Sequence, residues 1–396
     1  MTRYDCVIVG GGPAGATAAA ELAAAGHKVL LLDRGGRIKP CGGAIPPRLL
    51  ADFAIPEHLL VGRAVTARMI GPSDATVDMA VDRTGDGYVG MVDRETFDEW
   101  LRARAAVSGA ERRTGTFDRI ERDDQRGAIV VYQDARGGPE QRVAATCVIG
   151  ADGARSRVAR GAIPGAERMP SVFAYHEVIR SPAPAPSDTF DRGRCDVFYQ
   201  GVVSPDFYGW VFPHGDTASV GTGSANKGFP LREAVGRLRA HAGLAECETI
   251  RREGAPIPLK PLRRWDNGRD VLVTGDAAGA VAPASGEGIY YAMVAGHEAA
   301  AAAGAFLRSG DPRALARARR AFMRAHGRVF WILGIMQHFW YRNDRRRERF
   351  VAMCGDRDVQ NLIWPAYRTK RLAYAHPLAY LRIFLKDMRH LLQTAG

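Results

Sequence analysis

The first strand-like segment of the chain, YDCVIV, breaks into a run of glycines. Gly10, Gly12 and Gly15 stand at GxGxxG spacing before an alanine-rich stretch. The pattern predicts a strand, a tight turn and a helix: Gly10 permits the turn, Gly12 lets the backbone approach a pyrophosphate, and Gly15 lets helix and strand pack closely. Helix N–H groups near Pro13 and Ala14 then face the phosphates with a favourable dipole. We therefore predict a dinucleotide site at this turn.

An acid stands where such a site needs one. A second apolar segment, residues 28–32, ends in Asp33, eighteen residues beyond Gly15. Two strands joined by a short helical crossover are parallel and right-handed, so Asp33 is placed to accept hydrogen bonds from a ribose, with Arg34 next to it. A glycine-rich turn without a ligand is the alternative. The agreement of strand, helix, acid and spacing favours binding.

A second motif occurs late in the chain, at residues 270–288. A predicted apolar strand there is followed by a Gly-Asp pair, and further glycines precede another alanine-rich helix. This arrangement suits a ribityl chain and the electron-rich edge of a flavin ring, whereas a buried hairpin with a helix cap is the alternative. The candidate cofactor residues of this segment are Gly275, Asp276, Pro283, Gly286, Gly288 and Ile289.

Three motifs together resemble the FAD-dependent oxidoreductases of the aromatic-hydroxylase fold: GGGPAG, GADGARS at 150–156, and the late Gly-Asp pair. This similarity covers residues 1 to about 325. The segments KPCGGAIP at 39–46 and SPDFYGWVFP at 204–213 resemble the geranylgeranyl reductases, in the branch that acts in chlorophyll and bacteriochlorophyll synthesis. The C-terminal extension is also similar to that branch.

The resemblance implies an α/β fold with noncovalent FAD in a Rossmann-like domain of the glutathione-reductase and aromatic-hydroxylase type. Cys41, Gly42 and Gly43 would border the flavin, and Arg94 would lie near its pyrophosphate, although a surface helix arginine would look the same. Asp152, at the end of a strand, would orient the cofactor or the following helix; a simple turn residue is the alternative. The family more often has Glu at the position of Asp33, but the shorter acid can still reach a ribose.

The electron donor implied by the resemblance is NADPH, which would dock transiently because no second complete nucleotide fingerprint is present. Gly221-Thr222-Gly223 lacks the third glycine, and we interpret it as a turn.

Residues 170–262 have alternating apolar and aromatic residues with proline breaks, which predicts an antiparallel sheet. Tyr208, Trp210 and Phe212 alternate so that they share one face. An aromatic face can be ordinary core. Beside a flavin it could instead line a long apolar tunnel of the kind a prenyl chain needs.

The prenyl substrate that the resemblance implies contains isolated trisubstituted alkenes. Such an alkene has no carbonyl group to accept charge. Hydride delivery therefore needs a proton at the other carbon, and positive charge develops at the tertiary centre. Cys41 is the acid that matches the family, with Tyr208 or a held water as the alternative. Trp210 and Phe212 could stabilise the cation through their ring faces. A purely structural Cys41 is the competing interpretation.

The positive charge of the chain is concentrated near its C-terminus. The net charge is +12, from 55 basic and 43 acidic residues, and residues 328–396 hold thirteen Lys or Arg against five Asp or Glu. Aromatic side chains are interspersed with these charges, which favours an anionic membrane interface. A helical cap with a solvated basic face is the alternative; nucleic acid is disfavoured because no binding module accompanies the charge. Among these aromatic residues are Trp331, Phe339, Trp340, Tyr341, Trp364, Tyr367, Tyr374, Tyr380 and Phe384.

Composition sets the broad limits. With 396 residues, of which 46% are hydrophobic and 25% charged, the chain is neither disordered nor a disulfide-held mini-protein. Six cysteines without CxxC, and no signal peptide, predict a reducing cytosolic compartment without a zinc site. No run of about 20 apolar residues predicts a spanning helix. We expect a FAD-binding domain over 1–169, with a small β insertion near 62–92, and 263–327; a substrate domain over 170–262; and a basic aromatic helical region over 328–396.

The resemblance to the geranylgeranyl reductases implies an FAD-dependent oxidoreductase that saturates isolated double bonds of a geranylgeranyl group, as the diphosphate or esterified to a (bacterio)chlorophyll, to give phytyl. We expect it to be peripheral to the cytoplasmic side of a membrane and to associate with pigment-synthesis enzymes, in an oligomeric state left open. An oxygen-consuming aromatic hydroxylase is the nearest alternative, but the PCGG and YGWVFP segments argue against it. A flavin-bearing pigment-binding or assembly protein is the other alternative.

Overall fold

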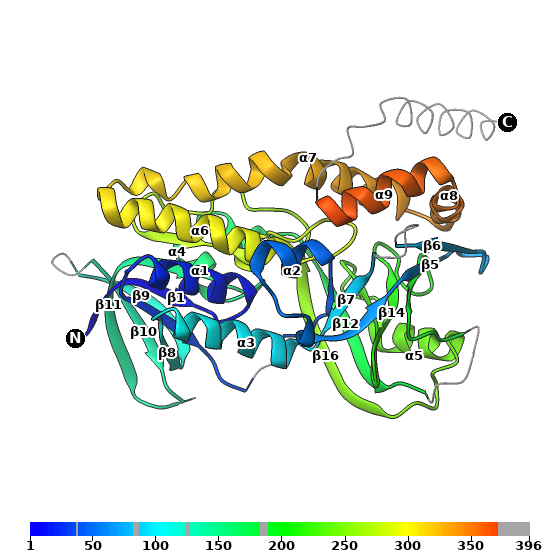
Figure 1. Cartoon of the computed structure of the whole chain (residues 1–396), viewed down its shortest axis with the longest axis horizontal. Helices are drawn as coiled ribbons and strands as arrows, with labels where there is room; N and C mark the ends of the chain where they lie inside the picture. Colours follow the sequence, from blue (N-terminus) through cyan, green and yellow to red (C-terminus); the bar gives the residue numbers. More distant parts are fainter. Residues whose placement is uncertain (37–38, 82–86, 124–126, 136, 183–188, 371–396) are drawn as a thin grey trace. The chain divides into compact units, whose positions relative to one another are not determined.

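The computed structural model describes residues 1–36, 39–81, 87–123, 127–135, 137–182 and 189–370 (Figure 1). The chain divides into two compact units. The first unit contains residues 1–43, 92–174 and 254–335, and the second contains 44–91, 175–253 and the chain from 336 onward.

The first unit is built on a seven-stranded sheet with the order β8-β2-β1-β11-β10-β9, in which β17 also pairs with β11. The strands β8, β2, β1, β11 and β17 run parallel, whereas β9 and β10 add antiparallel pairs at one edge. Residues 6–9 of β1 have the continuous apolar burial typical of a parallel strand covered on both faces. The bounds are β1 Arg3–Val9, β2 Val29–Asp33, β8 Glu111–Thr114, β9 Thr116–Asp123, β10 Gly127–Gln133, β11 Glu140–Gly150 and β17 Val271–Val273.

Helices α1 and α6 lie side by side in this unit (Figure 1). A Cβ at Gly296 of α6 would lie 2.3 Å from the carbonyl oxygen of Ala14, so glycine allows the close crossing. On its other side, α6 carries Tyr291, whose ring lies 5.2 Å from that of His326 and 5.0 Å from that of Phe330 on α7. The helices that begin in this unit are α1 Pro13–Ala24, α3 Arg94–Val107, α4 Arg157–Ala162, α6 Ile289–Ser309 and α7 Arg317–Trp340, with 3-10 turns η2 Ala166–Arg168, η3 Gly275–Ala278 and η4 Pro312–Ala314.

A second seven-stranded sheet has the order β16-β12-β15-β14-β13-β5-β6. The pairs β5–β6, β13–β14 and β14–β15 are antiparallel, and β13 pairs with β5 in parallel. A three-stranded sheet, β3-β7-β4, accompanies it. The bounds are β3 Ala44–Ile45, β4 Leu60–Ala64, β5 Thr66–Ile70, β6 Thr76–Ala80, β7 Val89–Val92, β12 Ser171–Arg180, β13 Arg194–Phe198, β14 Gly209–His214, β15 Thr217–Ser224 and β16 Thr249–Pro258.

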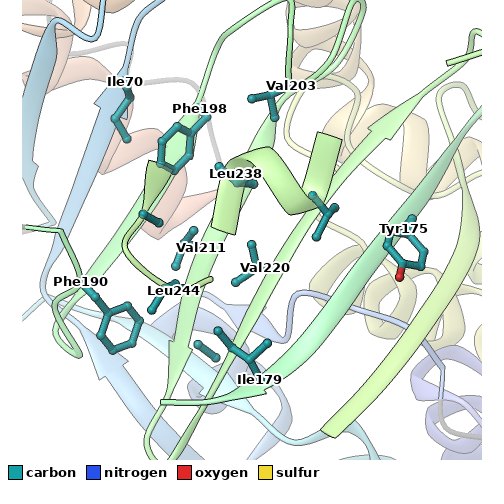
Figure 2. Packing of buried hydrophobic residues seen from close by; sticks show 13 residues of the cluster. Ile70, Tyr175, Ile179, Phe190, Phe198, Val203, Val211, Val220, Leu238 and Leu244 are labelled. Carbon is teal, nitrogen blue, oxygen red and sulfur yellow. The ribbon is translucent and has the colours of Figure 1, made fainter. Parts of the chain in front are cut away.

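The core of the second unit lies between its seven-stranded sheet and α5, residues Leu231–His241. Figure 2 shows Val211 of β14 and Val220 of β15 pointing towards Leu238 of the helix. Because successive side chains on a strand alternate between faces, Trp210 and Phe212 must lie on the opposite face of the sheet from α5. The remaining helices of the unit are α2 Pro47–Phe53, η1 Glu57–Leu59, α8 Asp344–Cys354 and α9 Arg357–Thr369.

The α/β fold class, with its Rossmann-like domain, antiparallel pairs and helical C-terminal region, is confirmed. The interpretation of Gly221-Thr222-Gly223 as a turn is wrong, because all three residues lie within β15. A Cβ at Gly221 would lie 2.3 Å from Cζ2 of Trp210 on the paired strand. The glycine therefore makes room for an indole ring rather than for a change of chain direction.

Helix α8 of the C-terminal region packs within the second unit. On α8, Phe350 lies 4.9 Å from the ring of Tyr199, and Glu348 accepts a hydrogen bond of 2.6 Å from the hydroxyl of Ser73. Among the described residues, no helix combines the length and apolar character needed to cross a bilayer. Tyr374, Tyr380 and Phe384 lie outside the described residues.

Candidate active site

The glycine turn has the geometry that its spacing predicts. Gly10 has a φ of +105°, a conformation that favours glycine, and a Cβ at Gly15 would lie 1.9 Å from the carbonyl oxygen of Gly10. A Cβ at Gly12 would meet nothing within 4 Å. No described side chain caps the start of α1, where Pro13 and Ala14 form the first turn. Gly12 and the free N–H groups behind it therefore border open space, which is the cradle that a pyrophosphate requires.

The late Gly-Asp motif meets this turn. Gly275 has a φ of +60°, and a Cβ there would lie 2.7 Å from that of Ala14. Asp276 follows in η3, is buried, and forms an ion pair with Lys39. The chain then passes through buried Pro283 to the start of α6.

Three further predicted residues surround that helix start. Gly286 has a φ of +65°, Gly288 is the N-cap residue of α6, and Ile289 is its first residue. No described side chain caps this N-terminus either. The structure thus brings together two helix starts and the Asp276 carboxylate from opposite ends of the chain.

Asp33 ends β2 beside the glycine turn. Its carboxylate accepts hydrogen bonds from the backbone N–H groups of Gly11 and Arg34, and lies 3.4 Å from Nη1 of Arg102. Burial raises the pKa of Asp33, and these donors and the Arg102 charge oppose that effect. Arg34 contributes its backbone, because its side chain is exposed.

Arg94 is the first residue of α3, whose N-cap is Asp93. The guanidinium is buried and bidentate on Asp98, with Nε–Oδ1 at 2.9 Å and Nη2–Oδ2 at 2.6 Å. It also donates to the sulfur of Cys41. Burial opposes the charge, but the Asp98 carboxylate and Cys41 outweigh it and raise the pKa of Arg94 further, so Arg94 is a fixed cation. The alternative of a surface helix arginine is wrong.

Cys41 is half-buried in the loop before β3. Its sulfur accepts from the backbone N–H of Gly43, at 3.4 Å, as well as from Arg94. Gly43 has a φ of +69°, which turns the loop so that its N–H faces the sulfur, with Gly42 between the two residues. Both contacts are donated to sulfur, so neither uses the S–H proton of the neutral thiol. The role of Cys41 as a proton donor stays a prediction.

Asp152 follows β11 and holds the start of α4. One carboxylate oxygen accepts from the hydroxyl of Ser156 at 2.5 Å, and the other accepts from the backbone N–H of Arg157 at 2.7 Å. Burial raises the pKa of Asp152, and these hydrogen bonds oppose the rise. The side chain therefore orients the following helix; a contact with the cofactor stays a prediction.

In the second unit, Tyr208, Trp210 and Phe212 form a continuous aromatic face. The ring centroids are 6.0 Å apart for Tyr208 and Trp210 and 6.4 Å apart for Trp210 and Phe212. Tyr208 also stacks on Phe207 at 4.3 Å. The geometry of one shared face is as predicted, while the roles of the three residues stay predictions.

Sequence reasoning missed several residues that complete these groups. Lys39, Asp98 and Arg102 contact predicted site residues, and His176 and Ser219 approach Trp210. Lys39 lies inside the KPCGG motif, and Asp98 lies one helical turn after Arg94. The local sequence could therefore have indicated both residues. His176 and Ser219 had none, because their strands are neighbours only in the folded sheet.

The fold and this site define an FAD-binding oxidoreductase: the open cradle at Gly12, the acid at the end of β2 and the two uncapped helix starts fit a flavin dinucleotide. Residues 4–182 match the family model described as pyridine nucleotide-disulphide oxidoreductase. The geranylgeranyl diphosphate reductase of Rhodobacter capsulatus is 54% identical, over 98% of this chain and 97% of its own. The chain therefore belongs to the geranylgeranyl reductase family.

Other comparisons agree. The chloroplastic geranylgeranyl diphosphate reductase of rice is 35% identical, over 100% of this chain and 87% of its own. Among solved structures, a geranylgeranyl bacteriochlorophyll reductase-like protein from Thermoplasma acidophilum has a TM-score of 0.82 at 23% identity, covering 96% of this chain and 100% of that chain. The flavin-dependent brominase Bmp2 has a TM-score of 0.74 at 16% identity, covering 98% and 100%. Both solved structures have the same fold as this chain.

Proposed function

We propose that this protein reduces the isolated double bonds of a geranylgeranyl group, presented as the diphosphate or as a (bacterio)chlorophyll ester, to give phytyl. The observation that carries the proposal is the row of three aromatic rings formed by Tyr208, just before β14, and by Trp210 and Phe212 within it, in a chain that also holds a dinucleotide cradle. A long apolar chain needs such a surface, and positive charge that develops on it is stabilised by ring faces. The family to which the chain belongs supports the same substrate class.

FAD, bound noncovalently and reduced by NADPH that docks transiently, supplies the hydride. Gly12 and the start of α1 bind the pyrophosphate, and Asp33 accepts from the ribose. Arg94 stays charged and holds the Cys41 sulfur in place. Cys41 delivers the proton to the alkene carbon, with Tyr208 as the alternative donor. Trp210 and Phe212 face the developing charge and exclude water from it.

The protein is peripheral to the cytoplasmic side of a membrane in this proposal, close to enzymes of pigment synthesis. Support comes from α7, where Trp331 is 69% exposed and Ile335, one turn later, is 48% exposed. The basic side chain of Arg324, two turns before Trp331 on the same helix, is exposed as well. Aromatic and aliphatic side chains next to positive charge suit the interface of an anionic leaflet.

Mass spectrometry of the prenyl product tests the function. The holoprotein, reduced anaerobically, is incubated in parallel with geranylgeranyl diphosphate and with a geranylgeranyl-esterified pigment. Gain of two hydrogens per saturated bond in either substrate supports the proposal and identifies the preferred form. Oxygen consumption that yields a hydroxylated aromatic product would instead support the hydroxylase, and tight pigment binding without any turnover would support the assembly protein.

A further inference from the structure

A chain of hydrogen bonds crosses four neighbouring strands on the face of the second sheet that carries Trp210. The indole Nε1–H of Trp210 on β14 donates to Oγ of Ser219 on β15, at 3.0 Å. The same Oγ lies 2.9 Å from Nδ1 of His176 on β12, and Nε2 of His176 lies 3.2 Å from Oε2 of Glu253 on β16. The strand order β16-β12-β15-β14 places these four residues in sequence across the sheet.

The donors and acceptors of this chain have one consistent direction. The Glu253 carboxylate, paired with Arg251 at 2.6 Å, can only accept, so Nε2 of His176 carries a proton. In the neutral imidazole, Nδ1 then accepts from the Ser219 hydroxyl, which leaves a lone pair of that oxygen for the indole N–H. Each group is used, and His176 and Ser219 are buried. A satisfied buried network of this kind fixes side-chain orientation.

The space around the indole is shaped for the same orientation. A Cβ at Gly221 would lie 2.3 Å from Cζ2 of Trp210 and 2.5 Å from Cβ of His176. The indole therefore lies over a strand position that has no side chain, and the ring of His176 flanks it at 6.3 Å between centroids. The indole ring occupies the space that Gly221 leaves free, and its Nε1 is held by the hydrogen bond to Ser219. Together these two contacts define the plane of the ring.

We propose that His176 and Ser219 are positioning residues, which hold the Trp210 indole, through the network anchored at Glu253, in the plane that presents its face to the reacting prenyl chain. The inference rests on the proposed function for its substrate. Neither residue touches the alkene; they act through Trp210. The ring face stabilises positive charge, which develops in the transition state and is absent from the bound substrate. Loss of the network therefore lowers kcat more than it raises KM.

The orientation is tested by nuclear magnetic resonance on the full-length holoprotein with 15N-labelled tryptophan. The six tryptophans give indole N–H signals, and the signal that disappears in Trp210→Phe belongs to Trp210. Ser219→Ala and His176→Phe should shift this signal and accelerate its hydrogen exchange. His176→Gln, which can accept from Ser219 and donate to Glu253, should restore it. Ser181→Ala is the matched control, because the hydroxyl of this buried serine of the same unit has no hydrogen-bond partner among the described residues.

Kinetics with geranylgeranyl diphosphate test the consequence. We expect Ser219→Ala and His176→Phe to lower kcat by roughly two- to thirty-fold, the range of a lost cation–π contact, with KM little changed and His176→Gln near the parental rate. Should Ser219→Ala not fold, the two His176 variants decide alone. An unchanged Trp210 signal, or a changed signal with parental kcat, would overturn the inference. A parental holoprotein that leaves the chain unreduced would overturn the proposed function and the catalytic half of this inference, whereas the indole signals would still report the network.

Discussion

The guanidinium of Arg347 on α8 donates to the carbonyl oxygen of Pro205, three residues before Tyr208. The same side chain donates to the carbonyl of Tyr341 and, at 2.6 Å, to Asp344, and it is 2% exposed. The last arginine of the basic Arg345-Arg346-Arg347 cluster is therefore structural. A C-terminal helix holds the segment that leads into the aromatic face.

This contact predicts the effect of Arg347→Met. The substitution leaves the buried carbonyl of Tyr341 and the half-buried carbonyl of Pro205 without this donor, which costs about 1–3 kcal/mol. We expect urea denaturation to show a fall of that size in the free energy of unfolding. Arg345→Met, at an exposed position of the same cluster, is the control and should stay within about 0.5 kcal/mol of the parent. Equal stability of both variants would contradict the role of Arg347.

The same contact explains why charge patterning alone was insufficient. In sequence, Arg345 and Arg347 are equivalent members of a basic run. Arg345 is exposed, whereas Arg347 donates to the carbonyl of nearby Tyr341 and to that of Pro205, which lies far away in the sequence. Deletion of residues 328–396 would remove α8 together with this anchor. The membrane hypothesis is therefore better tested by point substitutions.

Local signals were enough for the cofactor turn. The structural roles of Gly10 and Gly15 can be predicted from their spacing. A strand, a tight turn and a helix within a few residues allow few other backbone conformations. The ion pair of Lys39 with Asp276 depends on segments at opposite ends of the chain. The network at Trp210 depends on the order of four strands, which no local pattern encodes. Gly221 shows the ambiguity directly: the same residue type serves a turn or the close approach of a ring.

The open space at Gly12 predicts that Gly12→Val empties the flavin site without unfolding the chain. A Cβ there meets no atom of the protein, so the added side chain clashes only with the pyrophosphate. We expect purified Gly12→Val to lack flavin absorbance and to retain the parental circular dichroism. Gly236→Val, at an exposed position of α5 with equally open space, should keep its flavin. Full flavin absorbance in Gly12→Val would mean that the glycine turn has been misinterpreted.

FAD affinity should weaken on acidification because of Asp33. A ribose hydroxyl donates to the ionised carboxylate, and burial raises the pKa of Asp33 above the ordinary value of about 3.9. Affinity is therefore complete above the raised pKa and is lost as the pH falls through it. Titration of the apoprotein with FAD between pH 7 and pH 4.5, followed by flavin fluorescence, should show Kd increasing towards the acid end. Asp33→Asn should bind more weakly and lose this pH dependence; an identical pH profile in the variant would assign the effect to another group.

The exposed residues of α7 predict a membrane contact that point substitutions can remove. Trp331→Ser together with Ile335→Ser should reduce flotation with anionic vesicles, because apolar surface near positive charge is lost. Higher salt should release part of the parental protein, since screening weakens the contribution of about 1 kcal/mol from each basic residue near the leaflet. Val107→Ser, which removes an apolar side chain that is 90% exposed at the end of α3, is the control. Undiminished flotation of the double variant would reject this surface as the contact.

The proton donor gives the last prediction. The Cys41 sulfur accepts from Arg94 and from the N–H of Gly43, so a thiol at this position keeps its proton free for the alkene. Cys41→Ala should bind FAD and accept electrons from NADPH at the parental rate, because the cradle at Gly12 and the ion pair of Arg94 with Asp98 remain. Saturation of the prenyl chain should slow by about 10²–10⁴, the range for a lost general acid. Stopped-flow flavin absorbance separates the two half-reactions, and Cys247→Ala, at another half-buried cysteine, should leave both unchanged. If Cys41→Ala saturates the chain at the parental rate, the proton comes from elsewhere, and Tyr208→Phe then becomes the variant that must slow the second half-reaction alone.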